Sequence, residues 1–268
     1  MTRRIPLRVV DTPADVHRAF ARWLADFIAE RNAAGLSTRL ILPVGPTLGY
    51  PLLREITSRE RISWSQVQIV TMDEYLDDWG RPLAPEHALS FTGFMLGFLA
   101  SLDADLRPRN DAFVWPDPFE IDRVPRFIDR IGGIDACLGG VGVHGHVAFN
   151  EPPNDRHTHT AIERFRQSPT RVVALAPETR VMNATRSQGG RIDDFPTMAV
   201  TIGMREILAA SRIRLFCDGG TWQQEALRQA ITGEVSVSYP VTLLQGHGDV
   251  EIVADRLTAA TAAAAAPS

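Results

Sequence analysis

The sequence predicts an α/β fold built on buried parallel strands. Short apolar runs of strand length alternate along the chain with longer segments whose apolar residues recur at helical spacing. One of these runs, 134–138, leads directly into a stretch of glycines, histidines and a carboxylate at 139–151. Open α/β sheets place their active sites where strands end in such loops. We therefore expect the functional residues at the carboxyl ends of the strands.

Length and composition favour a single domain. The chain has 268 residues, of which 44% are apolar, and its α/β pattern runs without a linker over residues 1–257. A formal net charge of −4 argues against nucleic acid as a partner. No apolar run has transmembrane length and the N-terminus lacks a signal-peptide core, so we expect a cytoplasmic protein with no membrane partner. Cys137 and Cys217 lie in apolar runs and are expected to be buried thiols.

The absence of lysine limits the possible chemistry. All 28 basic residues are arginine. Schiff-base chemistry, a pyridoxal-phosphate lysine and a Walker lysine are therefore excluded. Any phosphate or carboxylate has to be held by arginine, by backbone N–H groups or by hydroxyls.

The elements can be assigned in order. Thr12 and Pro13 are typical of a helix start, and the helix that follows buries a face that extends to Ile28. Further helices are expected through 52–56, 87–102, 121–131, 180–186, 207–208 and 226–231. Strands are expected at 8–10, as an edge, and at 40–42, 67–71, 134–138, 172–175, 198–202, 213–217 and 250–253. Asp77 and Asp78 are expected to cap a helix, 107–118 to be loop, and the alanine-rich tail 258–268 to be frayed.

The stretch after the central strand carries the strongest functional signal. It reads G-G-V-G-V-H-G-H-V-A-F-N-E-P over 139–152. Its glycines allow tight turns and close approach of a ligand, and His144, His146 and Glu151 supply groups for proton transfer. A glycine-rich turn that only satisfies its own backbone is the weaker interpretation, because two histidines and a glutamate fall within eight positions of a chain with seven histidines.

Two other strand ends add candidates. Residues 43–47 join a strand to a helix through Gly45, which is a common anion-binding arrangement and equally a plain turn. The strand at 67–71 ends in T-M-D-E-Y, where a carboxylate can act as a general base.

These motifs together resemble the glucosamine-6-phosphate deaminase family. The resemblance rests on T-M-D-E-Y at 71–75, G-H-V-A-F-N-E-P at 145–152, and Thr179-Arg180-Val181 with Asn183, in the family's order from about Arg8 to Asp255. It implies a three-layer α/β/α sandwich around a mostly parallel sheet, related to ribose-5-phosphate isomerases and phosphogluconolactonases. It also implies conversion of an aminosugar phosphate and water to a ketose phosphate and ammonia.

The resemblance also implies roles for single residues. Asp73 matches the base that moves the C2 proton, His146 the histidine that opens the sugar ring, and Glu151 the carboxylate that orients this histidine. His144 completes the catalytic set from the position two before His146. Substrate and phosphate contacts are implied for seven further residues: Gly45, Pro46, Thr47, Glu74, Gly142, Arg186 and Gln223. The resemblance implies no cofactor and no metal, and a homo-oligomer stays open.

Some positions depart from the family pattern. His144 stands where many members have an acidic or amide residue, so it cannot support His146 as a carboxylate does. Pro46 removes one backbone donor from the phosphate loop. Gln223 stands where a phosphate-binding lysine is expected, which leaves Arg186 as the cation. We therefore predict a weakened phosphate site.

Four functions remain open at this point. The first is an aminosugar-phosphate deaminase or isomerase with an altered site. The second is a divergent isomerase or lactonase-type hydrolase on a different or non-phosphorylated sugar. The third is a weakly catalytic sugar-phosphate-binding protein. A metal hydrolase built on His144, His146, His157 and His159 is the least favoured, because no acidic third ligand has a clear spacing signal.

Overall fold

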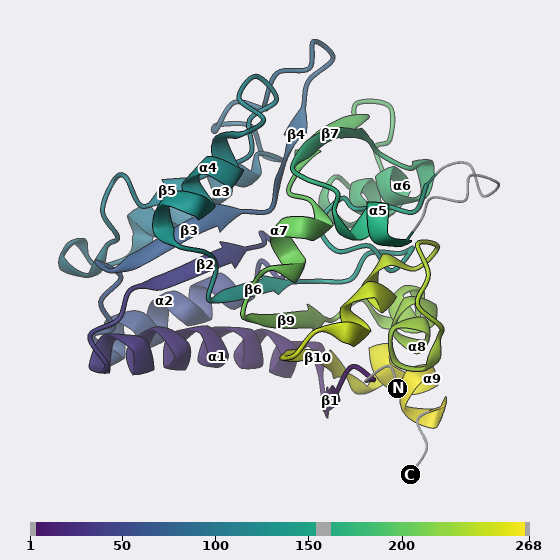
Figure 1. Cartoon of the computed structure of the whole chain (residues 1–268), viewed down its shortest axis with the longest axis horizontal. Coiled ribbons are helices and arrows are strands. Elements are labelled where there is room, and N and C mark those ends of the chain that lie inside the picture. Colours follow the sequence, from purple (N-terminus) through teal and green to yellow (C-terminus); the bar gives the residue numbers. More distant parts are fainter. Residues whose placement is uncertain (1–3, 154–161, 266–268) are drawn as a thin grey trace.

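A parallel sheet forms the centre of the protein (Figure 1). The computed structural model describes residues 4–153 and 162–265, and within them the sheet has seven strands. In spatial order these are β1 (Leu7–Val10), β10 (Val250–Asp255), β9 (Arg212–Cys217), β6 (Ala136–Gly139), β2 (Thr38–Leu42), β3 (Val67–Thr71) and β5 (Phe113–Val114). Every neighbouring pair is parallel. The predicted α/β class and the edge position of the first strand are confirmed.

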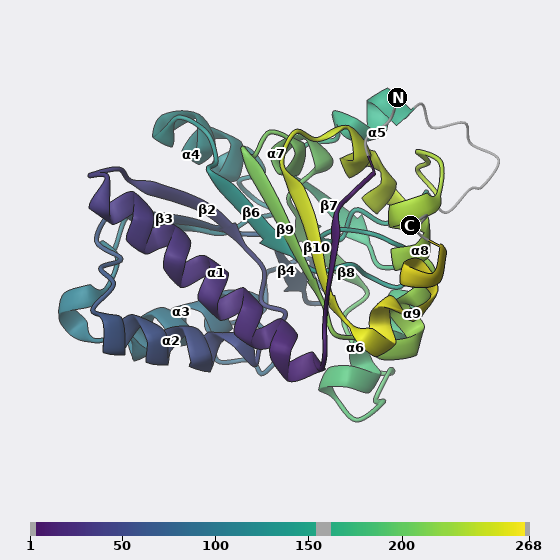
Figure 2. The same ribbon diagram turned by 90° about the horizontal axis from the view of Figure 1, so that it is seen from below.

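Helices cover both faces of this sheet, which confirms the three-layer sandwich (Figure 2). The apolar side chains of β2 alternate: Leu40 and Leu42 belong to one core and Ile41 to the other. The first core is shared with α1 (Pro13–Ala33), α2 (Gly49–Glu60) and α3 (Phe91–Ser101). The second is shared with α4 (Arg123–Ile131), α7 (Met204–Leu208), α8 (Gln224–Thr232) and α9 (Arg256–Ala265).

A smaller antiparallel sheet, which the sequence pattern did not predict, stands beside the main one. Its order is β4 (Asp73–Leu76), β8 (Met198–Thr201) and β7 (Arg171–Ala174), and both neighbouring pairs are antiparallel. The chain leaves β3 at Thr71 and enters β4 after a single residue, Met72. A third apolar cluster around Tyr75 and Phe149 packs under this sheet. α5 (Ile162–Arg166) and α6 (Pro177–Ser187) lie next to it (Figure 1).

Several local expectations need correction. The helix expected from residue 87 begins at Phe91, because the Ser90 hydroxyl caps it by accepting from Gly93 N. Asp77 does not cap a helix; its carboxylate closes a turn by accepting from Trp79 N and Arg81 N. Within the loop expected at 107–118, β5 pairs with β3. Short 3₁₀ helices occur at η1 (Ala104–Leu106), η2 (Gly220–Gln223) and η3 (Pro240–Gly246).

The alanine-rich tail is helical rather than frayed as far as the structure describes it. Alanine has the highest helix propensity, and Ala259 and Ala262 are fully buried in the core that α9 shares with α8. The Asp255 carboxylate caps this helix by accepting from Leu257 N and Thr258 N. Packing and capping therefore hold the segment in place.

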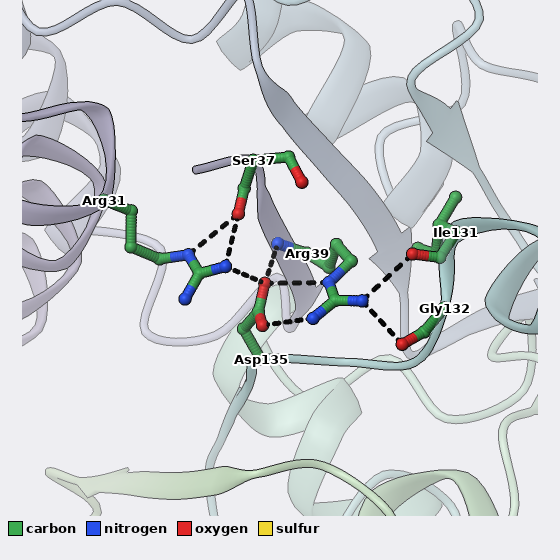
Figure 3. Close-up of polar contacts among 6 residues, drawn as sticks. All are labelled: Arg31, Ser37, Arg39, Ile131, Gly132 and Asp135. Atoms are coloured by element: carbon green, nitrogen blue, oxygen red, sulfur yellow. Dashed lines mark hydrogen bonds and ion pairs between the residues drawn. The ribbon is translucent and has the colours of Figure 1, made fainter. Parts of the chain in front are cut away.

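A buried ion-pair network closes the end of the sheet opposite the glycine-rich loop. The Asp135 carboxylate, next to the start of β6, accepts hydrogen bonds from the Arg39 backbone and guanidinium (Figure 3). Arg39 also donates to the Ile131 and Gly132 carbonyls at the end of α4, and Arg31 pairs with Asp135 at 3.0 Å. Burial alone would raise the pKa of Asp135, but the hydrogen bonds from Arg39 hold this pKa below its usual value. This network is structural.

Two compositional expectations have structural counterparts. Cys137 and Cys217 are buried and free, as predicted. Among the described residues, no helix combines the length and the apolarity needed to span a bilayer.

Candidate active site

The strand ends predicted to carry function meet in one pocket. The pocket lies beyond the carboxyl ends of four adjacent strands, β9, β6, β2 and β3. β6 and β2 are neighbours in the sheet, but the chain continues from β2 toward β3 on one side and from β6 toward β9 on the other. Open α/β sheets bind ligands at such a switch point. The polar side chains that line the pocket are Asp73, His146, Asn183, Arg186, Asp218 and Gln223.

The glycine-rich loop holds His146 in a fixed position. Gly142 N donates to the His146 carbonyl at 2.8 Å, and Gly145 N donates back to the Gly142 carbonyl at 2.9 Å. A Cβ on Gly142 would lie 1.9 Å from His146 Nε2, so only glycine leaves room for the imidazole. Gly145 (φ +72°) and Ala148 (φ +52°) both adopt left-handed backbone, the second at some cost for a residue with a side chain. The loop is thus built to place one imidazole against its own backbone.

Asp73 is the buried carboxylate of the pocket. It is the first residue of β4, where the chain passes from the parallel to the antiparallel sheet, and pairs across the sheet with Thr201. Burial, with a further contribution from the neighbouring Glu74 charge, raises the pKa of Asp73 to about 8. Asp73 is therefore a neutral acid near pH 7 and becomes a base at higher pH.

His146 is held as a neutral imidazole. Burial, together with the nearby His144, lowers the pKa of His146 to about 3. The His146 Nδ1 atom is buried and has no hydrogen-bond partner. The predicted orienting carboxylate, Glu151, has one oxygen within 4.8 Å of a His146 nitrogen. Its Oε2 accepts from Ala176 N at 2.7 Å, whereas its Oε1 is buried without a partner.

His144 lies beside these two residues. Its ring centroid is 6.2 Å from that of His146. His144 Nε2 lies 3.9 Å from a carboxylate oxygen of Glu178 on α6, while its Nδ1 is buried without a partner. The structure thus brings His144, His146 and Glu151 together, as the sequence predicted.

Glu74 does not line the pocket, so its predicted substrate contact stays a prediction without a geometric basis here. Successive strand residues point to opposite sides, and Glu74 points away from Asp73 toward the start of α3. Its carboxylate is fully buried and accepts from the Ser90 hydroxyl and from Tyr75 N, Phe91 N and Thr92 N. Glu74 therefore anchors α3 to β4.

The predicted phosphate residues are only partly brought together. Gly45 and Pro46 line the pocket, and their peptide bond is cis, but Thr47 is exposed outside the lining. Gln223 is buried, and both ends of its amide bond backbone: Nε2 donates to the Val141 carbonyl and Oε1 accepts from Gly219 N. Gln223 therefore ties two strand-end loops together, which leaves one N–H donor and one lone pair of its amide for a ligand.

Asp218 is a functional candidate that the sequence reasoning missed. It follows β9 directly, lines the pocket, and lies 3.5 Å from the Arg186 guanidinium. Its other oxygen lies 2.7 Å from Nε2 of His17, a buried residue of α1. Arg186 also stacks over Trp222 with its Cζ 5.3 Å from the ring centre. The position at a strand end was the available signal, whereas the partner on α1 is 201 residues away in the chain.

Two further polar residues support the pocket. Asn183 donates from Nδ2 to the Tyr75 hydroxyl at 3.0 Å. Asn150 is fully buried, donates to the Val147 and Ile202 carbonyls, and accepts from Arg171, so it fixes the loop after His146 to the end of β8. His157 and His159, considered above as metal ligands, lie outside the described residues.

Comparison with known proteins decides the family. No family model matches the chain. Glucosamine-6-phosphate deaminase of Porphyromonas gingivalis strain W83 is 33% identical over 246 residues, which cover 88% of this chain and 87% of that one. The chain belongs to the glucosamine-6-phosphate deaminase family. The family's enzyme from Staphylococcus haemolyticus is 34% identical over 77% of this chain and 79% of its own, and that of Caenorhabditis elegans is 32% identical over 92% and 88%.

Solved structures agree with this membership. A monomeric glucosamine-6-phosphate deaminase superposes with a TM-score of 0.78 at 27% identity and covers 96% of this chain and 100% of its own. A 6-phosphogluconolactonase from Trypanosoma cruzi has a TM-score of 0.66 at 19% identity, with 97% of each chain covered. This second likeness shows a shared fold and carries no information on activity.

Proposed function

We propose that the protein is an aldose–ketose isomerase and deaminase that converts glucosamine 6-phosphate and water to fructose 6-phosphate and ammonia. The observation that carries the proposal is the pairing of a buried carboxylate, Asp73, and a buried imidazole, His146, in one pocket of a chain from this family. The relatives named above are glucosamine-6-phosphate deaminases, and each aligns with this chain over most of its own length.

The proposed chemistry needs His146 neutral, as it is held, and Asp73 ionised, which its raised pKa favours only as the pH approaches about 8. His146, held neutral, accepts the proton of the anomeric hydroxyl and returns it to the ring oxygen, which opens the sugar. Asp73 in its ionised form removes the C2 proton and delivers it to C1, while one amine proton passes to the aldehyde oxygen, so that C2 becomes an imine carbon and C1 a CH₂OH group. Addition of water to this imine and loss of ammonia leave the ketose. Glu151 orients His146 and stabilises the charge that passes through it.

The direct test follows both products. Purified protein is incubated with glucosamine 6-phosphate and, separately, with free glucosamine, N-acetylglucosamine 6-phosphate and 6-phosphogluconolactone. We expect ammonia and fructose 6-phosphate in equal amounts from glucosamine 6-phosphate. Lactone hydrolysis with no ammonia release from any amino sugar would contradict the proposal.

One observation favours a second candidate substrate. The pocket contains the Asp218 carboxylate, and Arg186, the cation predicted to bind phosphate, is paired with this carboxylate. Gln223 is neutral, and its amide forms hydrogen bonds with backbone groups. A differently substituted or non-phosphorylated amino sugar would meet less repulsion here than a phosphate. The same four-substrate assay separates the two candidates, because the second predicts faster turnover of free glucosamine.

If the substrate is a phosphate, Asp218→Asn should improve its binding. Removing one negative charge at about 8–10 Å in a medium of effective dielectric constant about 20 changes the interaction by ~2 kcal/mol per unit charge. We expect KM for glucosamine 6-phosphate to fall at least about thirtyfold, with free glucosamine as the control that lacks the phosphate. Asn keeps the shape of the side chain and can still bond His17. An unchanged ratio of the two KM values would show that no phosphate is bound near Asp218.

A further inference from the structure

Three side chains around the catalytic imidazole carry polar atoms that have no partner. The atoms are His144 Nδ1, His146 Nδ1 and Glu151 Oε1, and all three are buried. Leaving a polar atom buried and unpaired costs about 1–3 kcal/mol, so three such atoms in one cluster indicate a bound species. Each of the three residues also offers one ligand atom, and these atoms lie within 4.8 Å of one another.

The types of ligand in this cluster indicate which metal ion it suits. Two imidazoles and one carboxylate suit zinc and similar transition metals, whereas magnesium and calcium prefer oxygen ligands alone. Three protein ligands are typical of zinc sites with an open fourth position. His146 lines the pocket, so that position would face it. The sequence alone lacked the acidic third ligand, and the fold supplies it as Glu151.

One of the two contacts behind these residues, the hydrogen bond to Glu151, is of the kind that supports metal ligands. The second oxygen of Glu151 accepts from Ala176 N, and the second nitrogen of His144 lies 3.9 Å from the Glu178 carboxylate. Metal-binding histidines and carboxylates commonly have their other polar atom held in this way. Both contacts come from the start of one helix, α6. A tetrahedral zinc with bonds of about 2.0–2.1 Å keeps its ligand atoms roughly 3.4 Å apart. Zinc binding therefore requires these three side chains to move closer together than they lie here.

We propose that His144, His146 and Glu151 bind one zinc ion per chain. This site is additional to the activity proposed above. If that activity is correct, zinc inhibits it, because an imidazole that coordinates a metal through one nitrogen and keeps its proton on the other cannot accept a proton from the sugar. The inhibition rests on the proposed function, whereas zinc binding does not.

Zinc binding is tested on untagged, full-length protein that has been freed of metal by chelation. Isothermal titration with Zn²⁺ should show one equivalent bound, and Co²⁺ should give the visible absorption of a tetrahedral nitrogen and oxygen site. His144→Asn should weaken Zn²⁺ binding at least a hundredfold. The matched control is His87→Asn, which removes an exposed imidazole from a loop and should leave zinc binding unchanged. Thermal unfolding without metal checks that each variant is folded.

The outcomes separate the two proposals. Deaminase activity without stoichiometric Zn²⁺ binding overturns the metal site alone. Binding of Zn²⁺ without deaminase activity supports the site and counts against the function. Zinc binding that survives His144→Asn but is lost when His157 and His159 are both replaced by Asn would also overturn the site, because the metal would then be held elsewhere. With both proposals correct, activity falls as Zn²⁺ is added and returns with a chelator.

Discussion

Asp73→Asn should reduce kcat by about a thousandfold on the true substrate, because general-base catalysis contributes roughly 10²–10⁴ and asparagine cannot accept the C2 proton. Asp73 lies at the pocket wall and is almost fully buried, so no other carboxylate of the β3–β4 junction can replace it: Glu74 is committed to α3. Steady-state kinetics on the purified variant measure the loss. Turnover within tenfold of wild type would remove Asp73 from the role of base.

Because the pKa of Asp73 is raised, kcat/KM of the wild type should depend on pH in a way that Asp73→Asn removes. Because the base must be ionised, kcat/KM of the wild type should rise with pH and level off above a pKa of about 8. Asp218→Asn is the matched control, since it removes a pocket carboxylate without touching Asp73, and its profile should keep this rise. A wild-type profile that is already flat between pH 6 and 9 would contradict the assignment.

The stability of the wild-type protein should fall as pH rises, whereas its kcat/KM should rise. The folded-state pKa of Asp73 lies above the usual aspartate value of 3.8, so the folded protein keeps a proton that the unfolded chain releases. This contribution to stability is fully present below the unfolded pKa and is lost as pH rises toward about 8. Asp73→Asn has no such proton to lose. Urea unfolding at pH 5 and pH 8 should therefore show the variant gaining stability relative to wild type at the higher pH, which separates a catalytic defect from a folding defect.

The residues around Asp73 also show what a single sequence can and cannot reveal. β2 contains the apolar run Leu40–Leu42 and β3 the apolar pair Ile69 and Val70, so their class and parallel pairing follow from pattern. β4 was missed because no turn residue marks the change of sheet at Met72, and its partner β8 begins more than a hundred residues later. The hydrogen bonds of Glu74 were missed for the same reason: the helix start that binds its carboxylate lies 16–18 residues away.

The site itself was predictable where it is local and not where it depends on distant partners. Gly142, Gly145 and His146 interact within five residues, so the motif contains their geometry. Asp218 gains its role from His17, and Gln223 becomes a backbone link only because Val141 and Gly219 come together in the fold. The helical tail likewise needs the core of α8 and α9, which composition does not show.

His146 and Glu151 should act as a unit, and this is the second large effect. In the absence of zinc, kept out by chelator, His146→Gln should reduce turnover by roughly 10²–10⁴ through loss of ring opening. Glu151→Gln should lower it as well, because the carboxylate near His146 no longer stabilises the charge on the ring. No hydrogen bond yet joins the two in the free protein, where His146 Nδ1 and Glu151 Oε1 are both unpaired, and catalytic hydrogen bonds often tighten only when substrate binds.

The double variant decides whether they share one step. Members of a catalytic unit are strongly non-additive, so His146→Gln combined with Glu151→Gln should be little slower than His146→Gln alone. His87→Gln, on an exposed loop, controls for the loss of an imidazole in general and should keep wild-type turnover. Thermal unfolding of all four variants checks that each is folded. This check matters most for the variants that replace Glu151, because its carboxylate also accepts a hydrogen bond from Ala176 N. Losses that multiply in the double variant would place the two residues in separate steps, and the carboxylate would then hold the start of α6 without taking part in ring opening.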